Sequence, residues 1–233
     1  MSIAQERAMK ILALDTATER CSVALRIDGQ LTERVVDTAR GHADLILPMV
    51  EEILREAGVS LRDLDGIAYG RGPGAFTGVR IAIGVVQGLA FGADLPAVGI
   101  SDLAAVAQQV ARPGDRVLVC MDARMSEVYW ATFHCDANSA LVAASSAEQV
   151  GRPETVETHE THAAINVLAG TGFRAYPQLV SAFHGLAIHD GVLPRAAEIA
   201  LLGETELRAG RGHPAAQAQP VYLRDQVAVA KKT

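Results

Sequence analysis

The chain has 233 residues, of which 49% are hydrophobic and only 4% aromatic, so we expect one large domain or two small ones with largely aliphatic cores. Its formal net charge is −6, and no segment concentrates basic residues beyond the terminal Lys231 and Lys232. This charge balance argues against a protein that binds nucleic acid unaided, because phosphate binding needs a basic surface.

Cysteine usage and the N-terminal segment indicate a reducing compartment. The three cysteines are an odd number without C-x-x-C spacing, which argues against a disulfide framework or a zinc cluster. The first ten residues are charged and lack an apolar run, so we expect no secretion signal. The most apolar window, residues 81–100, is interrupted by polar residues and a proline. We therefore expect a cytoplasmic protein without a membrane segment.

The first half of the chain reads as strands followed by alternating helices and strands. Residues 10–36 form apolar runs around an Asp28-Gly29 turn, which is the pattern of an antiparallel meander. An amphipathic helix is expected at Asp44–Ala57, ended by Gly58. The elements expected after it are a strand at 65–69, a helix at 78–91 capped by Thr77, a strand at 95–101 and a helix at 102–110.

The start of the meander recurs in the second half of the chain. "ILALDTATERCSVAL" and "LVCMDARMSEVYWATF" both give a strand, an aspartate, a charged turn and a second strand, with Asp15 and Asp122 in equivalent places. This repetition indicates a duplication. We expect an α/β fold of two lobes with mixed sheets flanked by helices, at residues 1–111 and 112–233. In the second lobe, residues 150–164 look loop-like, and a helix is expected within 194–210.

Four glycines form a loop ahead of the second helix: Gly70, Gly72, Gly74 and Gly78. One interpretation is a phosphate cradle at a helix N-terminus. However, the loop lacks the Lys-Ser/Thr ending of a P-loop, and Ala75 stands where G-x-G-x-x-G would need its third glycine. We favour a structural role, in which the glycines allow positive φ and a close approach of backbone.

The helix after this loop is apolar around nearly its whole circumference, with glycines four residues apart at 84, 88 and 92. Such a helix must be buried on more than one face, either in its own domain or against a partner. We favour a protein partner. Accordingly, Ala82→Arg or Val86→Glu is expected to leave the monomer folded and to prevent complex formation.

Two side-chain pairs are candidates for ligand binding. Asp15 and Asp122 are weak candidates for cofactor binding, since they could hold Mg²⁺ and ATP between the lobes. Their turns contain no glycine, so turn formation is favoured for both. His159 and His162 have a spacing that could bind metal, but with no third ligand in view a solvated role is favoured.

Five segments in chain order resemble the TsaB (YeaZ) family, which includes the dimerization subunit of the TsaD complex in tRNA threonylcarbamoyladenosine biosynthesis. They are "ILALDTATERCSVAL", "GHADLILPMVEEIL", "GRGPGAFTGVRIAIGVVQGLAFG", "MDARMSEVYWATF" and "PVYLRD". The resemblance implies a duplicated actin-like (ASKHA, RNase H-like) fold. It also implies a role in making N6-threonylcarbamoyladenosine at position 37 of tRNAs that read ANN codons.

The resemblance further implies a pseudoenzyme without catalytic residues, cofactor or metal. The catalytic relative carries a His-x-x-x-His metal pair on its first helix, whereas this chain has His42 followed by Ile46. The implied partners are a TsaD-like catalytic subunit, a TsaE-like ATPase through the complex, a second copy when alone, and tRNA only indirectly. A four-helix interface is expected, with contact residues Leu45, Met49, Ile53, Val79, Ala82, Ile83, Val86, Gln87 and Ala90.

Two other functions stay open at the level of the sequence. One is an enzyme of the actin-like superfamily, a nucleotide-binding transferase or a peptidase-like protein that uses Asp15 and Asp122. The other is a homodimeric binding module with no link to tRNA.

Overall fold

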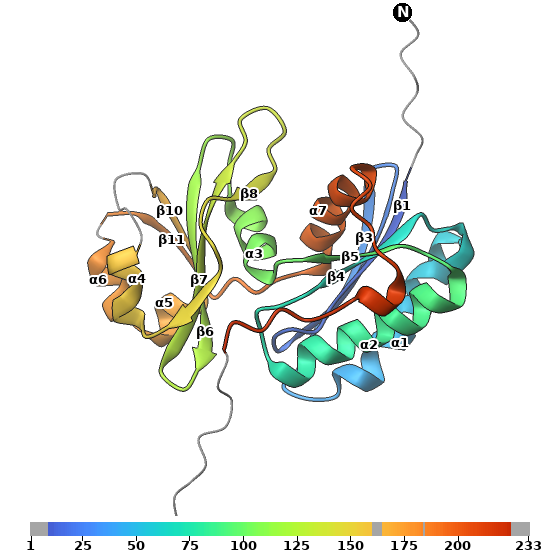
Figure 1. The fold of residues 1–233 in the computed structure, drawn as a ribbon, viewed down its shortest axis with the longest axis horizontal. Coiled ribbons are helices and arrows are strands. Elements are labelled where there is room, and N and C mark those ends of the chain that lie inside the picture. The colour runs from blue at the N-terminus through green and yellow to red at the C-terminus, as the bar shows by residue number, and fades with distance from the viewer. Residues whose placement is uncertain (1–8, 160–164, 184, 225–233) are drawn as a thin grey trace, which may run out of the picture. The chain divides into compact units, whose positions relative to one another are not determined.

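A computed structural model describes residues 9–159, 165–183 and 185–224, which form two compact units (Figure 1). The first unit contains residues up to Ala105 together with 194–220, and the second contains 106–193 together with the residues from Val221. This differs from the predicted division at 111/112. The reason is helix α7 (Ala196–Arg208), which returns late in the chain to pack on strands β1, β2 and β4 of the first unit.

The first unit is built on a five-stranded mixed sheet with strand order β3-β2-β1-β4-β5. Strands β1, β2 and β3 form the predicted antiparallel meander, and both residues of its Asp28-Gly29 turn have positive φ, as a tight hairpin requires. Strands β4 and β5 add in parallel to β1. The strands are β1 (Lys10–Asp15), β2 (Arg20–Ile27), β3 (Gln30–Asp37), β4 (Gly66–Gly70) and β5 (Ala97–Ile100).

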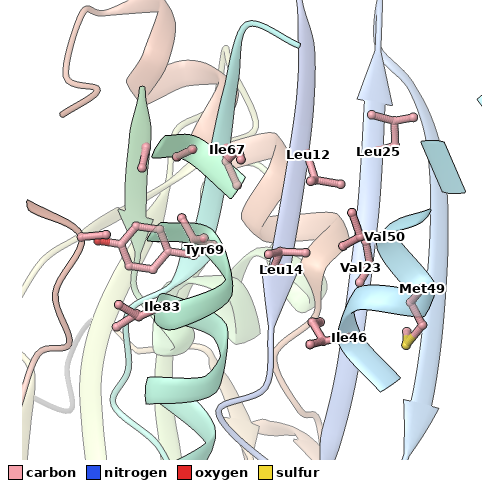
Figure 2. Close-up of a cluster of buried hydrophobic side chains, with 14 of the residues drawn as sticks. Leu12, Leu14, Val23, Leu25, Ile46, Met49, Val50, Ile67, Tyr69 and Ile83 are labelled. Carbon is pink, nitrogen blue, oxygen red and sulfur yellow. The ribbon is translucent and has the colours of Figure 1, made fainter. Parts of the chain in front are cut away.

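Helices α1 (His42–Ala57) and α2 (Phe76–Ala93) lie on one face of this sheet, and α7 lies on the other (Figure 1). The strand register places Leu12 with Leu25 and Leu14 with Val23 on the face that α1 and α2 cover. Figure 2 shows these side chains packed against Ile46 and its neighbours on α1. The alternate residues of β2, including Ser22, face α7 instead, as period-two strands require.

The N-terminus of α7 is capped by side chains that are distant in the sequence. The Ala196 N–H donates to Ser22 Oγ at 2.9 Å, and the Ala197 N–H donates to Glu33 Oε1 at 3.1 Å. Both acceptors come from the meander. Two of the helix's unpaired amides are therefore satisfied by the sheet on which α7 packs, which fixes the point where the helix begins.

Ser22→Ala is expected to destabilise the chain by about 1–2 kcal/mol, because Ser22 is fully buried and the Ala196 N–H would lose its acceptor in the interior. Urea unfolding of the two proteins measures this difference. The exposed Ser181→Ala in helix α6 (Gln178–Ala182) is the matched control, for which we expect no loss. Equal free energies of unfolding for wild type and Ser22→Ala would show that the cap contributes nothing.

The second unit repeats the topology of the first. Its sheet has the order β11-β10-β6-β7-β8, in which β6 pairs antiparallel with β7 and parallel with β10. Read from β8, this is the order of the first sheet, so the predicted duplication is confirmed. The strands are β6 (Arg116–Arg124), β7 (Glu127–Cys135), β8 (Val142–Ala144), β9 (Gln149–Gly151), β10 (Val167–Gly170) and β11 (Ala187–Asp190).

The helices of the second unit are shorter. Helix α3 (Asp102–Val110) begins in the first unit and continues into the second, followed by α4 (Pro153–His159), α5 (Gly172–Ala175) and α6. Two 3₁₀ turns, η1 (Leu61–Asp63) and η3 (Ala215–Gln217), complete the first unit. The loop-like prediction for 150–164 was wrong, because β9 and α4 occupy its first part. His159 ends α4, whereas His162 lies outside the described residues.

Candidate functional site

The glycine loop between β4 and α2 packs directly against the turn that joins β1 to β2. A Cβ on Gly78 would lie 2.0 Å from the Thr16 carbonyl oxygen, and one on Gly74 would lie 2.5 Å from that of Ala17. Gly72 has a φ of +97°. The structural interpretation of the loop, close backbone approach and positive φ, is therefore confirmed.

The same turn makes hydrogen bonds to the start of α2. The Ala75 N–H donates to the Ala17 carbonyl at 2.7 Å. The Thr16 hydroxyl donates to the Gly78 carbonyl at 2.7 Å and accepts from the Ala82 N–H at 3.1 Å. The predicted cap at Thr77 was wrong, since α2 begins at Phe76 and the neighbouring turn supplies the polar contacts. These contacts position the start of α2 against the β1–β2 turn.

Two buried carboxyl groups meet where the parallel strands β1, β4 and β5 end. Asp15 is the last residue of β1, and Asp102 follows β5 as the first residue of α3; neither is exposed at all. A Cβ on Gly70, at the end of β4, would lie 2.5 Å from Asp15 Oδ1 and 2.6 Å from Asp102 Oδ1. Only glycine fits between them. Burial raises the pKa of Asp15 to about 6 and, with the adjacent Asp15 charge, raises the pKa of Asp102 well above its ordinary value.

From the sequence, Asp15 was considered together with Asp122. In the structure, the carboxyl group beside Asp15 in the first unit is that of Asp102. Asp122 belongs to the second unit, where it accepts hydrogen bonds from the Arg124 N–H and the Tyr176 hydroxyl. Asp15 accepts in the same way from the N–H two residues on, at Ala17. Turn formation, the role favoured for both aspartates, is confirmed. Asp102 could have been noticed because the ends of neighbouring parallel strands meet at one edge of a sheet.

One side of α2 remains uncovered by the described residues of the chain. We call this side the α2 outer face; it consists of exposed residues Arg80, Gly84, Gly88, Phe91 and Gly92. Phe91 is 84% exposed, and none of the three glycines has an atom within 4 Å of the position of a Cβ. Length and composition alone would let α2 cross a membrane, yet its other side packs on the sheet. The outer face is therefore smooth, with Phe91 as its one large apolar side chain and Arg80 as its one charged side chain.

Comparisons with known proteins identify the family. The family model described as "TsaD: tRNA N6-adenosine threonylcarbamoyltransferase" matches residues 36–232. The tRNA threonylcarbamoyladenosine biosynthesis protein TsaB of Escherichia coli (strain K12) is 45% identical over 94% of this chain and 96% of its own length. The TsaB of Haemophilus influenzae is 39% identical over 94% of this chain and 95% of its own. The chain belongs to the TsaB (YeaZ) family.

A solved structure described as "YeaZ from Pseudomonas aeruginosa" shows the TsaB fold directly. It is 43% identical to this chain, has a TM-score of 0.84, and matches over 92% of this chain and all of that one. With the repeated strand order of the two sheets, this confirms a duplicated α/β fold with mixed sheets flanked by helices. The resemblance read from the five sequence segments is likewise confirmed.

Most of the predicted interface residues lie in the core of the chain itself. Two remain partly accessible, Leu45 and Gln87, and the Gln87 side chain donates to the Ala218 carbonyl at 2.9 Å. The expectation that Ala82→Arg or Val86→Glu leaves the monomer folded was wrong, because both side chains are fully buried against the sheet. The buried members of the predicted set are Met49, Ile53, Val79, Ala82, Ile83, Val86 and Ala90.

The first helix, α1, adds a second exposed surface and a buried histidine. Leu47, 49% exposed, and Pro48 lie on its outer side among acidic residues. His42 is 9% exposed, and Ile46 is buried in the core. Over the described residues, no three His, Cys, Asp or Glu side chains are grouped to hold a metal.

Proposed function

We propose that this TsaB-family chain is a non-catalytic scaffold for N6-threonylcarbamoyladenosine formation at position 37 of ANN-decoding tRNAs. It binds a TsaD-like catalytic subunit and, through that complex, a TsaE-like ATPase, and it contacts tRNA only indirectly. Alone in the cytoplasm it forms a homodimer. The observation that carries the proposal is the α2 outer face, which is smooth and exposes Phe91 although the rest of α2 is already packed.

The glycines of the α2 outer face suit a helical partner. Without a Cβ at Gly84, Gly88 and Gly92, the backbone of a second helix can approach closely along the axis of α2. Phe91 then supplies a large apolar anchor at one end of the contact. Leu47 and Pro48 on α1 extend the same kind of surface, so two helices of this chain meet two of the partner.

The match to the TsaD family model supports a partner with a related fold. A chain that aligns with that model over residues 36–232 shares its order of elements, so a TsaD-like subunit has helices that correspond to α1 and α2. A pseudo-symmetric contact between equivalent helices follows, like that of a homodimer. The homodimer and the complex then use one surface and exclude each other.

The non-catalytic role is supported by the surroundings of the residues that were candidates for catalysis or ligand binding. Asp15 is fully buried beside Asp102 in the first unit, and Asp122 accepts a hydrogen bond within a turn of the second. His42 has Ile46, a core residue, in place of a second metal-binding histidine. The Thr16–Ala17 turn occupies the start of α2, where an anion would bind.

Capture from a lysate followed by mass spectrometry tests the scaffold function. We expect the tagged wild-type chain to retain a TsaD-like protein, and depletion of the chain to remove N6-threonylcarbamoyladenosine from ANN-decoding tRNAs. Asp122→Asn is expected to restore the modified nucleoside to its wild-type level, because the contacts of this side chain with Arg124 and Tyr176 are structural. Full complex assembly without restored modification would instead support the enzyme hypothesis, and normal modification in depleted cells would contradict any role in this pathway.

A further inference from the structure

The carboxyl groups of Asp15 and Asp102 leave two buried oxygen atoms without a partner when both are ionised. Asp15 Oδ1 accepts from the Ala17 N–H at 2.9 Å, and Asp102 Oδ2 accepts from the Gly72 N–H at 2.6 Å. The other oxygens, Asp15 Oδ2 and Asp102 Oδ1, have no hydrogen-bond partner among the described residues. Two fully buried, adjacent negative charges with unpaired oxygens are strongly unfavourable.

One proton removes this conflict. A protonated Asp102 can donate its O–H to Asp15, since the two carboxyl groups are neighbours: the position of a Cβ on Gly70 lies 2.5 Å from Asp15 Oδ1 and 2.6 Å from Asp102 Oδ1. The pair then carries a single negative charge, and the backbone N–H of Ala17 still faces an ionised group. A carboxyl pair that shares one proton is the usual solution where two carboxylates cannot both ionise.

We propose that Asp15 and Asp102 share one proton in the folded chain at neutral pH, and that this proton fastens the glycine loop from which α2 starts. Asp102 holds that loop from both sides: its N–H donates to the Gly72 carbonyl at 3.0 Å, and its carboxyl group accepts from the Gly72 N–H. When the proton is lost, the two carboxylates repel each other beneath the loop. The proposal is independent of the proposed partner.

Three titratable groups on neighbouring elements act on the pair. His42 on α1 favours the ionised form of Asp15, and Arg71 after β4 favours that of Asp102. Cys21 on β2 stays neutral, because burial and the charge of Asp15 raise the pKa of its thiol to about 11. Burial of the pair outweighs the effects of His42 and Arg71 and raises the pKa of both aspartates.

The pH dependence follows from the direction of these shifts. A carboxyl group whose pKa is higher in the folded than in the unfolded chain stabilises the fold at low pH, and this stability is lost as pH rises through the folded pKa. The stabilisation that Asp15 contributes is lost as the pH rises from the ordinary pKa of an aspartate to about 6. That of Asp102 is lost as pH rises from its ordinary pKa through its raised pKa in the folded chain. The wild-type fold should therefore weaken steadily from mildly acidic to alkaline pH.

Asp102→Asn tests the proposal because it replaces the shared proton with a permanent donor. In this variant the amide oxygen at position 102 can accept from the Gly72 N–H while the amide NH₂ group donates to Asp15. We expect urea unfolding at pH 6, 7, 8 and 9 to show that the wild-type folding constant falls relative to this variant by up to about tenfold per pH unit. Asp94→Asn, the same chemical change at the exposed C-cap of α2, should follow the wild type at every pH.

Infrared spectroscopy gives a second readout that does not depend on stability. At pH 8 the wild type should show the carbonyl stretch of a buried protonated carboxyl group, and Asp102→Asn should lack it; Asp15→Asn provides the same comparison should Asp102→Asn not fold. Parallel pH profiles for wild type and Asp102→Asn would overturn the proposal. So would Mg²⁺ stabilising the wild type at pH 8 but not the variant, because a cation would then take the place of the proton.

Discussion

Gly88→Arg is expected to abolish association with the TsaD-like subunit and to leave the chain folded. Gly88 is exposed in the middle of the α2 outer face, and nothing lies within 4 Å of the position of its Cβ. Arginine also favours the helix by about 0.5–1 kcal/mol over glycine. In the complex, however, a long cation would separate the two helices and lie unpaired in an apolar contact. We expect at least about 100-fold weaker binding, or about 3 kcal/mol.

Isothermal titration of the purified catalytic subunit into each variant measures this loss. The control is Thr205→Arg, which adds the same charge at an exposed position of α7, on the opposite face of the sheet. Thr205→Arg should bind as the wild type does, and both variants should unfold cooperatively. Unchanged affinity of Gly88→Arg would show that the partner does not contact the α2 outer face.

Gly78→Ala is expected to destabilise the isolated chain by about 3 kcal/mol or more, whereas Gly84→Ala in the same helix should stabilise it by about 0.5–1 kcal/mol. The new methyl group at position 78 would lie 2.0 Å from the Thr16 carbonyl oxygen, which is backbone and cannot rotate away. At position 84 the methyl group would meet open space.

Thermal and urea unfolding of this matched pair separates glycines that the fold needs from glycines that it leaves for a partner. Because Gly84 lies on the α2 outer face, Gly84→Ala should also weaken the complex while it stabilises the chain. Equal stability of Gly78→Ala and wild type would contradict the close packing of the glycine loop against the β1–β2 turn.

Local pattern predicted most elements of the first unit because each carries its own signal. The period-two strands around Asp28-Gly29 and the amphipathic helix before Gly58 were recognised within a few residues of their observed ends. The irregular part of the second unit was read less well. Helix α4 has only seven residues and is largely polar, so its periodicity is too short to distinguish it from a loop.

The orientation of α2 could not be predicted, because its sequence is apolar on every side. A partner was predicted from large aliphatic residues such as Val79 and Val86. In the structure, the chain's own sheet covers these residues. The side left outside is marked by glycines, which carry no apolar side chain to reveal it. Only the position of the sheet distinguishes the two sides.

Contacts between distant segments were also beyond the reach of local pattern. Helix α7 was recognised as a helix, but its return to the first unit depends on partners such as Ser22, 174 positions earlier. Similarly, most of the strands and helices of the first unit separate Asp102 from Asp15 in the sequence, and only the strand order brings the two together. The repeat instead drew attention to Asp122, which is equivalent to Asp15 in topology and lies in the other unit.

A photo-crosslinking amino acid placed at position 88 tests most directly whether the α2 outer face binds the catalytic subunit. In cells, irradiation should join this chain to the TsaD-like protein, and the same probe at position 205 on α7 should not. Crosslinks to that protein from position 205 but none from position 88 would contradict binding through the α2 outer face.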